Sequence, residues 1–247
     1  LVAHGRRYRF LMTLHFVTCV SQMDVLNRYL LTSPCLQRGG YPLTARFNAR
    51  SAAEAFNAAM RAAGDATWLV WVHQDVVLPR GWDTQFLKAL ELAQTQFPHM
   101  AVAGVYGVSG AGASLRRAGH VLDRGMLLKE PTPLPCTVDS LDELLFAVRV
   151  DSGLQLDPAL GFDFYATDII LQAQARGLQG VAVDAYCEHW SDTPTDGVLS
   201  ERLLQRVGAS GAQFEQKWQH RLPVATACFE IHQVGDVGRF IEHLRHA

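Results

Sequence analysis

The residues at positions 68–72, WLVWV, form an unbroken apolar run that constrains the fold more than any other segment. A run of this length without polar alternation is typical of a strand buried on both faces, as in a sheet covered by helices. The polar residues His73, Gln74 and Asp75 follow it directly. Because open α/β sheets bind ligands beyond the carboxyl ends of their strands, the run predicts a polar site at this point.

Short apolar runs rich in β-type residues alternate with helical patterns along the rest of the chain. This alternation is typical of βαβ units, so we expect an α/β fold with a mainly parallel central sheet flanked by helices. The further strands that we expect are 13–20, 41–47, 101–108, 144–150 and 180–185, and the helices are 51–63, 82–96, 167–176 and 199–218. Residues 119–137 contain several prolines and are expected to form irregular hairpins.

The start of the helix at 51–63 has a recognisable signature. Ser51 and Glu54 have the spacing of a capping box, in which each side chain satisfies the other residue's backbone N–H. Apolar residues then recur at helical spacing and predict a buried stripe. Asn57 lies off this stripe.

Composition excludes several classes of protein. The 247 residues are 49% hydrophobic and 19% charged, which is typical of a globular domain. A net charge of −2 indicates no domain-wide basic surface, so nucleic acid is not an expected partner. Five cysteines without a CxxC pair favour reduced thiols and a cytoplasmic location. The apolar stretch at 10–20 is too short to span a bilayer, while the basic run at 6–9 leaves peripheral membrane association open.

Asp75 is the first candidate for chemistry. A carboxylate at the end of a buried strand is well placed to bind Mg²⁺ or Mn²⁺, which prefer oxygen ligands, and Mn²⁺ also accepts imidazole. Such a cation stabilises the charge that develops on a phosphate leaving group. The alternative is that Asp75 only caps the turn toward Pro79, a common role for Asp after a strand.

Residues 71–82, WVHQDVVLPRGW, resemble the HQD-V-x-L signature of glycosyltransferase family 2-like proteins of the streptomycin-biosynthesis StrF type. Residues 48–57 and 102–107 are similar to the segments before and after that signature, and the resemblance extends unevenly over 13–189. It implies a single GT-A-type domain over 1–247. The parts that it implies are a nucleotide-sugar-binding half at about 11–110, an acceptor and catalytic half at about 111–195, and a helical C-terminal segment at about 196–247.

The resemblance also implies a donor site. Asp75 would be the principal ligand of the metal and the diphosphate, with His73 beside it. The residues implied to lie at the nucleotide sugar are Ser21, Gln22, Asp24, Asn57, His73 and Asp75. For Asn57, a position on the helix surface without a partner is an equal alternative.

Residues 161–171, GFDFYATDIIL, resemble the acidic motif of GT-A enzymes, where a carboxylate at a helix start takes the acceptor proton. The chain departs from the motif because Tyr165 and Ala166 stand where an acidic pair is usual. Asp168 and Asp163 are therefore both candidates for the base. The alternatives are that Asp168 only opens the helix and that Asp163 is a solvated loop acid.

His189, in the segment CEHWS, resembles the histidine that completes the metal site near the end of GT-A domains. Cys187 beside it suggests zinc, but no second cysteine has the spacing of a structural zinc site. Asp142 and Glu143 resemble a family position on the acceptor side, and simple solvent exposure explains them equally well.

These observations predict an enzyme that transfers a sugar from a nucleoside diphosphate donor to an unidentified glycan, lipid-linked or small-molecule acceptor. The reaction would be metal-assisted, and the family resemblance implies inversion at the anomeric carbon, while the sequence itself leaves a retaining reaction open. One alternative is an inactive GT-A-shaped binding or scaffolding domain, which Ala166 favours. A nucleotidyltransferase-like enzyme is another alternative, although the basic triphosphate loop expected near the first strand is absent from the sequence.

Overall fold

The computed structural model describes residues 12–37, 40–191 and 199–246. Within them, a seven-stranded sheet has the order β2-β1-β3-β11-β5-β12-β9. Five of these strands point the same way, and only β11 and β9 run against them. The α/β class and the mainly parallel sheet are thus confirmed. The strands are β1 (Leu14–Val20), β2 (Leu43–Phe47), β3 (Trp68–Val72), β5 (Met100–Gly104), β9 (Cys136–Val138), β11 (Leu145–Arg149) and β12 (Gln179–Ala182).

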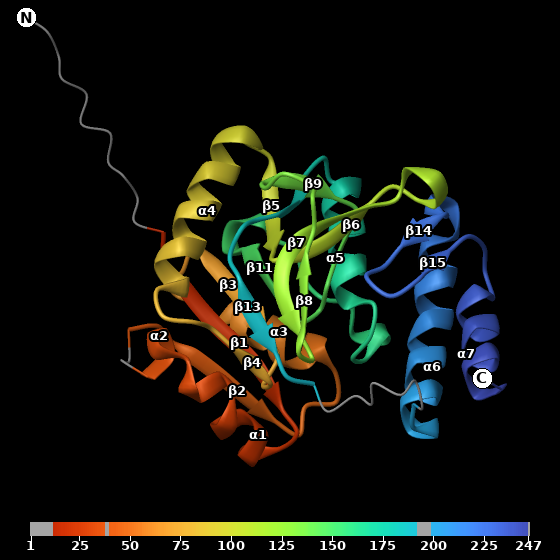
Figure 1. Ribbon diagram of the computed structural model, residues 1–247, viewed down its shortest axis with the longest axis horizontal. Coiled ribbons are helices and arrows are strands. Elements are labelled where there is room, and N and C mark those ends of the chain that lie inside the picture. The colour runs from red at the N-terminus through yellow and green to blue at the C-terminus, as the bar shows by residue number, and fades with distance from the viewer. Residues whose placement is uncertain (1–11, 38–39, 192–198, 247) are drawn as a thin grey trace, which may run out of the picture.

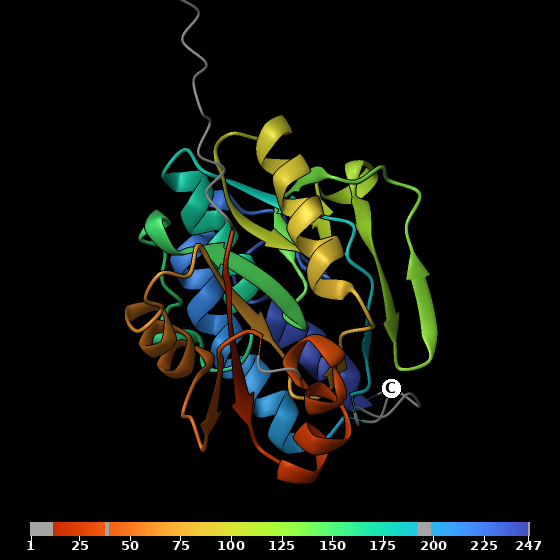
Figure 2. The same ribbon diagram turned by 90° about the vertical axis from the view of Figure 1, so that its left-hand side faces the viewer.

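Helices cover both faces of this sheet, as the apolar run of β3 predicts. Alternate residues of β3 enter two different hydrophobic clusters, one shared with α4 (Trp82–Gln96) and the other with α3 (Ala52–Arg61) and α5 (Tyr165–Ala175). Figure 2 shows α4 and α3 on opposite sides of the strands. All five residues of β3 are buried. The carboxyl end of β3 therefore emerges from a rigid core.

The capping of α3 differs in one detail from the predicted capping box. The Ser51 Oγ accepts a hydrogen bond from the Glu54 N–H at 3.1 Å, as expected. The Glu54 carboxylate instead accepts from the N–H of Arg50 at 3.0 Å. The N–H of Ala52 is bonded to the carbonyl of Gly161, which ties the helix start to the loop before α5.

A second sheet, with the order β10-β6-β7-β13-β4, stands beside the first, and β8 pairs with β7. Its strands are β4 (Val76–Val77), β6 (Tyr106–Ser109), β7 (Arg116–Asp123), β8 (Met126–Lys129), β10 (Ser140–Leu141) and β13 (Cys187–His189). The hairpins predicted for 119–137 correspond in part to β7 and β8. In the pairing of β13 with β4, His189 lies opposite Val76, so it stands beside Asp75 despite their distance in sequence.

The C-terminal part forms a small unit of two helices and a hairpin, which Figure 1 shows in blue beside α5. It contains α6 (Glu201–Trp218), β14 (Val224–Ala225), β15 (Glu230–Ile231) and α7 (Asp236–His246). Its apolar side chains pack on Leu160, Phe164 and Leu171 around α5. The remaining elements are α1 (Met23–Arg28), α2 (Pro34–Gln37) and the short turns η1 (Leu30–Thr32), η2 (Gly112–Ser114), η3 (Val150–Ser152), η4 (Pro158–Leu160) and η5 (Gln219–Arg221).

No helix in the described parts of the chain is long and apolar enough to cross a membrane. The basic run at 6–9, on which the expectation of peripheral membrane association rests, lies outside the described residues.

Candidate functional site

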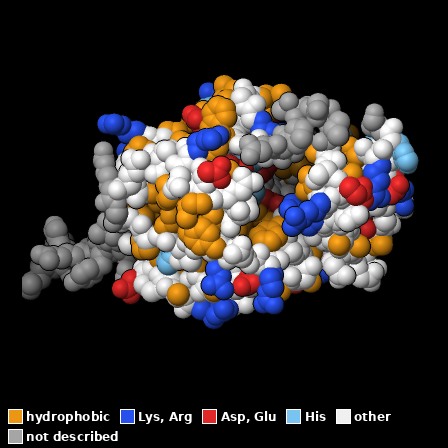
Figure 3. Space-filling model, turned by 90° about the horizontal axis from the view of Figure 1, so that it is seen from below, with side chains coloured by type: hydrophobic (Ala, Val, Ile, Leu, Met, Phe, Trp, Pro, Cys, Tyr) orange, Lys and Arg blue, Asp and Glu red, His pale blue; other side chains and the backbone are white. Residues whose placement is uncertain are grey.

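A cavity of about 850 Å³ opens where β1 and β3 end. Figure 3 looks onto this end of the molecule and shows a hollow with acidic and histidine side chains inside it. Ser21, His73 and Asp75 line the cavity, as the sequence predicts for a ligand site beyond the strand ends. Three arginines that the sequence analysis did not single out also line it: Arg50, Arg202 and Arg206. Their positive charges suit an anionic ligand.

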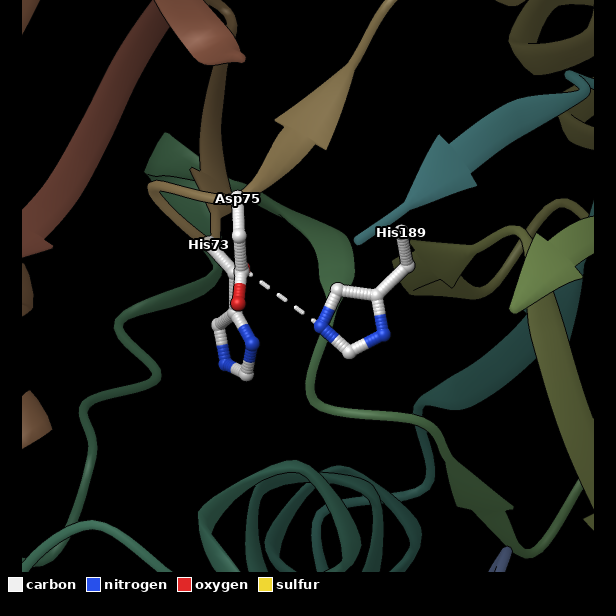
Figure 4. Close-up of side chains that lie close together, drawn as sticks. All are labelled: His73, Asp75 and His189. Carbon is white, nitrogen blue, oxygen red and sulfur yellow. Dashed lines mark ion pairs between the residues drawn. The ribbon is translucent and has the colours of Figure 1, made fainter. Parts of the chain in front are cut away.

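His73, Asp75 and His189 form a cluster at the cavity (Figure 4). One ligand atom from each residue lies within 4.8 Å of the others. His73 and Asp75 follow β3, whereas His189 ends β13, so the second sheet completes the cluster. One carboxylate and two imidazoles form a donor set that Mn²⁺ accepts.

Two atoms of this cluster indicate that a cation fits between them. The Asp75 Oδ1 and the His189 Nε2 lie 3.4 Å apart. Both atoms are buried, and neither has a hydrogen-bond partner. The two atoms attract each other as an ion pair when His189 is protonated, but they make no hydrogen bond, and buried polar atoms in native proteins nearly always make one. A divalent metal bound to both atoms would satisfy them.

His189 is held in a fixed orientation by Asp123, a residue that the sequence analysis did not identify. The His189 Nδ1 lies 2.8 Å from the Asp123 Oδ1, which leaves Nε2 facing Asp75. Burial by itself would lower the pKa of His189, but the carboxylates of Asp123 and Asp75 outweigh it and raise that pKa to about 9. Metal-binding histidines commonly have such a carboxylate on their other nitrogen.

His73 is electrostatically different from His189. Its Nε2 lies 2.9 Å from the hydroxyl of Tyr165. Burial lowers the pKa of His73 to about 4, and the neighbouring positive charges of His189 and Arg206 oppose its protonation further. His73 is therefore neutral at pH 7, which is the form that binds metals.

Gln74, between the two cluster residues of the HQD segment, organises the loop after β1. Its Oε1 accepts hydrogen bonds from the N–H groups of Ser21 and Gln22 at 3.0 and 3.2 Å, and its Nε2 donates to the Ser21 Oγ at 2.7 Å. Ser21 thereby stands at the cavity wall. Gln22 and Asp24 are exposed at the start of α1 and do not line the cavity.

Asn57 has a structural environment. Its amide donates to the carbonyl of Leu156 at 2.8 Å and accepts from the N–H of the same residue at 2.9 Å. The side chain is buried and does not line the cavity. Both alternatives from the sequence, a donor contact and an unpartnered surface position, missed this link between α3 and the loop before α5.

The two predicted candidates for the base are fully engaged with protein partners. Asp168 is 0% exposed, and it contacts the Lys217 Nζ and the Trp218 Nε1, each at 2.7 Å. Asp163 receives two hydrogen bonds of 3.0 Å from Arg206. Neither aspartate lines the cavity. These contacts favour structural roles, in which both aspartates fasten α6 to the segment around α5.

Comparisons with known proteins show only remote likeness. No protein-family model matches the chain. A protein of Fuscovulum blasticum described as "ATP synthase subunits region ORF 6" is 27% identical over 161 residues, which are 61% of this chain and 60% of that protein. The chain thus spans less than two thirds of that relative.

Among solved structures, the chain is similar to a mannosyltransferase from Pyrobaculum calidifontis in complex with GDP-Man and Mn²⁺. The TM-score is 0.48 at 10% identity, over 94% of this chain and 68% of that one. A structure of GalNAc-T7 with UDP, GalNAc and Mn²⁺ gives a TM-score of 0.49 at 10% identity, over 96% and 55%. Protein A197 from STIV gives 0.46 at 14% identity, over 74% and 87%. Each of these TM-scores is below 0.5, and the resemblance to StrF-type proteins stays a prediction.

Proposed function

We propose that this protein transfers a sugar from a nucleoside diphosphate donor to an acceptor, with Mn²⁺ or Mg²⁺ bound by Asp75 and His189 beside His73. The observation that carries the proposal is the facing pair of buried, unpartnered atoms on Asp75 and His189, beside a cavity lined by three arginines. A cation site beside arginine side chains suits a diphosphate, although Arg50 also pairs with Glu54 and Arg206 with Asp163.

Each part of the cavity has a role in this proposal. When bound, the metal neutralises charge on the diphosphate as the bond to the sugar breaks. Arg50 and Arg202 lie at the same cavity and add charge-assisted hydrogen bonds to phosphate oxygens. Ser21, fixed by Gln74, offers its hydroxyl to the nucleotide. Asp123 holds the ring of His189 in the orientation that directs Nε2 toward Asp75.

One specific observation favours the alternative, a nucleotide-sugar-binding domain without catalytic activity. Ala166 stands at the expected position of the base, and the neighbouring acids Asp163 and Asp168 are engaged with α6. Both functions require binding of the metal and the nucleotide. A measurement of catalytic turnover distinguishes the enzyme from the inactive binding domain.

The test is a thermal-shift panel of UDP, GDP, CDP and dTDP, each with and without Mn²⁺. A ligand that binds only the folded state stabilises it by about 2.7 kcal/mol at one hundred times its Kd. We expect a metal-dependent rise in melting temperature with one nucleotide, lost in Asp75→Asn and retained in the control Asp65→Asn, whose side chain is exposed. The proposal fails if no nucleotide gives a metal-dependent shift, or if Asp75→Asn keeps it.

A further inference from the structure

The hydroxyl of Tyr165 lies between the side chains of Trp71 and His73 and forms a hydrogen bond with each. The Trp71 Nε1 is 3.1 Å from this hydroxyl, and the His73 Nε2 is 2.9 Å from it. All three side chains line the cavity, and Tyr165 is buried. One hydroxyl therefore ties the start of α5 to the end of β3, at the wall of the proposed donor site.

The hydrogen atoms of these contacts can be assigned from the chemistry of the groups. An indole nitrogen only donates, so the Tyr165 oxygen accepts a hydrogen bond from Trp71. The hydroxyl keeps its own hydrogen, and the His73 Nε2 is the acceptor for it among the described residues. Because buried polar groups nearly always make their hydrogen bonds, we assign this hydrogen to the bond with His73. The His73 Nε2 then accepts, and the neutral ring carries its hydrogen on Nδ1.

This assignment distinguishes His73 from the other two residues of the cluster. In the described residues, the buried cluster atoms without a hydrogen-bond partner are the Asp75 Oδ1 and the His189 Nε2. A neutral histidine binds a metal through its unprotonated nitrogen, and in His73 that nitrogen is occupied by Tyr165. The remaining nitrogen of His73 is an N–H donor. Its ring lies beside the facing pair, with its centroid 5.6 Å from that of His189 (Figure 4).

We propose that His73 is a hydrogen-bond donor to the bound diphosphate and not a ligand of the metal, an inference that rests on the proposed function. A cation held by Asp75 and His189 brings phosphate oxygens next to the His73 ring. The Nδ1–H donates to one of these anionic oxygens, and hydrogen bonds to ionised groups are the strong ones. Tyr165 acts through His73 as a positioning residue, because its hydroxyl keeps the hydrogen of the ring on Nδ1.

Calorimetry separates a donor from a metal ligand. It measures binding of Mn²⁺ alone, and then binding of UDP, GDP, CDP and dTDP with Mn²⁺ present. His73→Asn keeps an N–H donor near the position of Nδ1, whereas His73→Ala has none. We expect both variants to bind Mn²⁺ within about threefold of wild type, and His73→Ala alone to lose about tenfold or more in nucleotide affinity. His99→Ala, at an exposed position, is the matched control and keeps both affinities.

Nuclear magnetic resonance tests the position of the hydrogen without metal or nucleotide. In protein labelled with ¹⁵N-histidine, protonated and unprotonated ring nitrogens give distinct signals, and His73→Asn identifies the pair that belongs to His73. We expect the hydrogen on Nδ1 in the wild type, and Tyr165→Phe to abolish this preference.

Two results would overturn the role of His73 in a protein that does bind a nucleotide with Mn²⁺. One is a hydrogen on Nε2 of His73 in the wild type. The other is a loss of Mn²⁺ affinity in both His73 variants as large as that in His189→Ala. A wild-type protein without metal-dependent nucleotide binding would instead overturn the proposed function itself.

Discussion

The end of β3 and the start of α5 both carry carboxylates that the sequence identifies as candidates for the functional site. In the structure, these carboxylates differ in whether their oxygens have hydrogen-bond partners. At the end of β3, Asp75 faces His189 with both facing atoms unsatisfied. Around the start of α5, Asp163 and Asp168 have their oxygens occupied by α6 and its neighbours. Burial does not distinguish the two regions, because all these carboxylates are largely enclosed. The hydrogen-bond partners of the carboxylate oxygens do distinguish them. Those partners indicate a ligand site at the end of β3 and a structural link at the start of α5.

The largest effect that follows from this comparison concerns stability. Asp168→Ala leaves the Trp218 Nε1 without its buried acceptor and leaves Lys217 with Asp157 as its remaining carboxylate, so we expect a loss of about 3 kcal/mol. Asp75→Ala removes one of the two carboxylates that face His189 and leaves the contact with Asp123, so its cost is smaller, about 1–2 kcal/mol. Urea unfolding of both variants measures the difference. A larger loss of stability for Asp75→Ala would reverse the assignment of the two regions.

A smaller effect is expected on metal affinity. Asp123→Asn weakens the hold on His189 without touching the cluster itself, and losing such a partner usually lowers metal affinity about 10- to 100-fold. Titration calorimetry with Mn²⁺ gives the value, and Asp65→Asn, at an exposed position, is the control. Equal affinity in Asp123→Asn and wild type would mean that His189 is not a ligand.

The smallest effect is the dependence of metal binding on pH. With a pKa of about 9, His189 carries a proton at pH 7 in the metal-free protein, and a metal must displace it. His73, with a pKa of about 4, is already neutral and releases none. We therefore expect Mn²⁺ affinity to rise about tenfold per pH unit from pH 7 to 8.5, the slope for release of one proton. Binding that is flat across this range would show that metal binding displaces no proton from His189.

The sequence predicted those features that local pattern determines. The apolar run of β3 indicated a strand covered on both sides, and the polar residues after it indicated where a cavity would lie; both agree with the structure. His189 was placed with Asp75 through a family resemblance, and the pairing of β13 with β4 brings the two together.

The remaining features depend on contacts between segments distant in sequence. Asp123 reaches His189 only because β7 and β13 are neighbours in the second sheet. Arg202 and Arg206 arrive at the cavity on α6, and no local pattern in the sequence shows that this helix reaches it. Glu143, which simple solvent exposure explained equally well in the sequence, is instead drawn against α5 by the hydrogen bonds of Trp71. Asn57 could not be assigned because its partner, Leu156, is 99 residues away.

The most direct test of the central claim is pulsed electron paramagnetic resonance of Mn²⁺ bound to the protein with the nucleoside diphosphate that stabilises it. Imidazole nitrogen coordinated to Mn²⁺ modulates the echo, and labelling the histidines with ¹⁵N changes that modulation in a known way. The account predicts histidine nitrogen coupling in the wild type that is lost or altered in His189→Ala. Bound Mn²⁺ with no histidine nitrogen coupling, or no bound Mn²⁺, would contradict it.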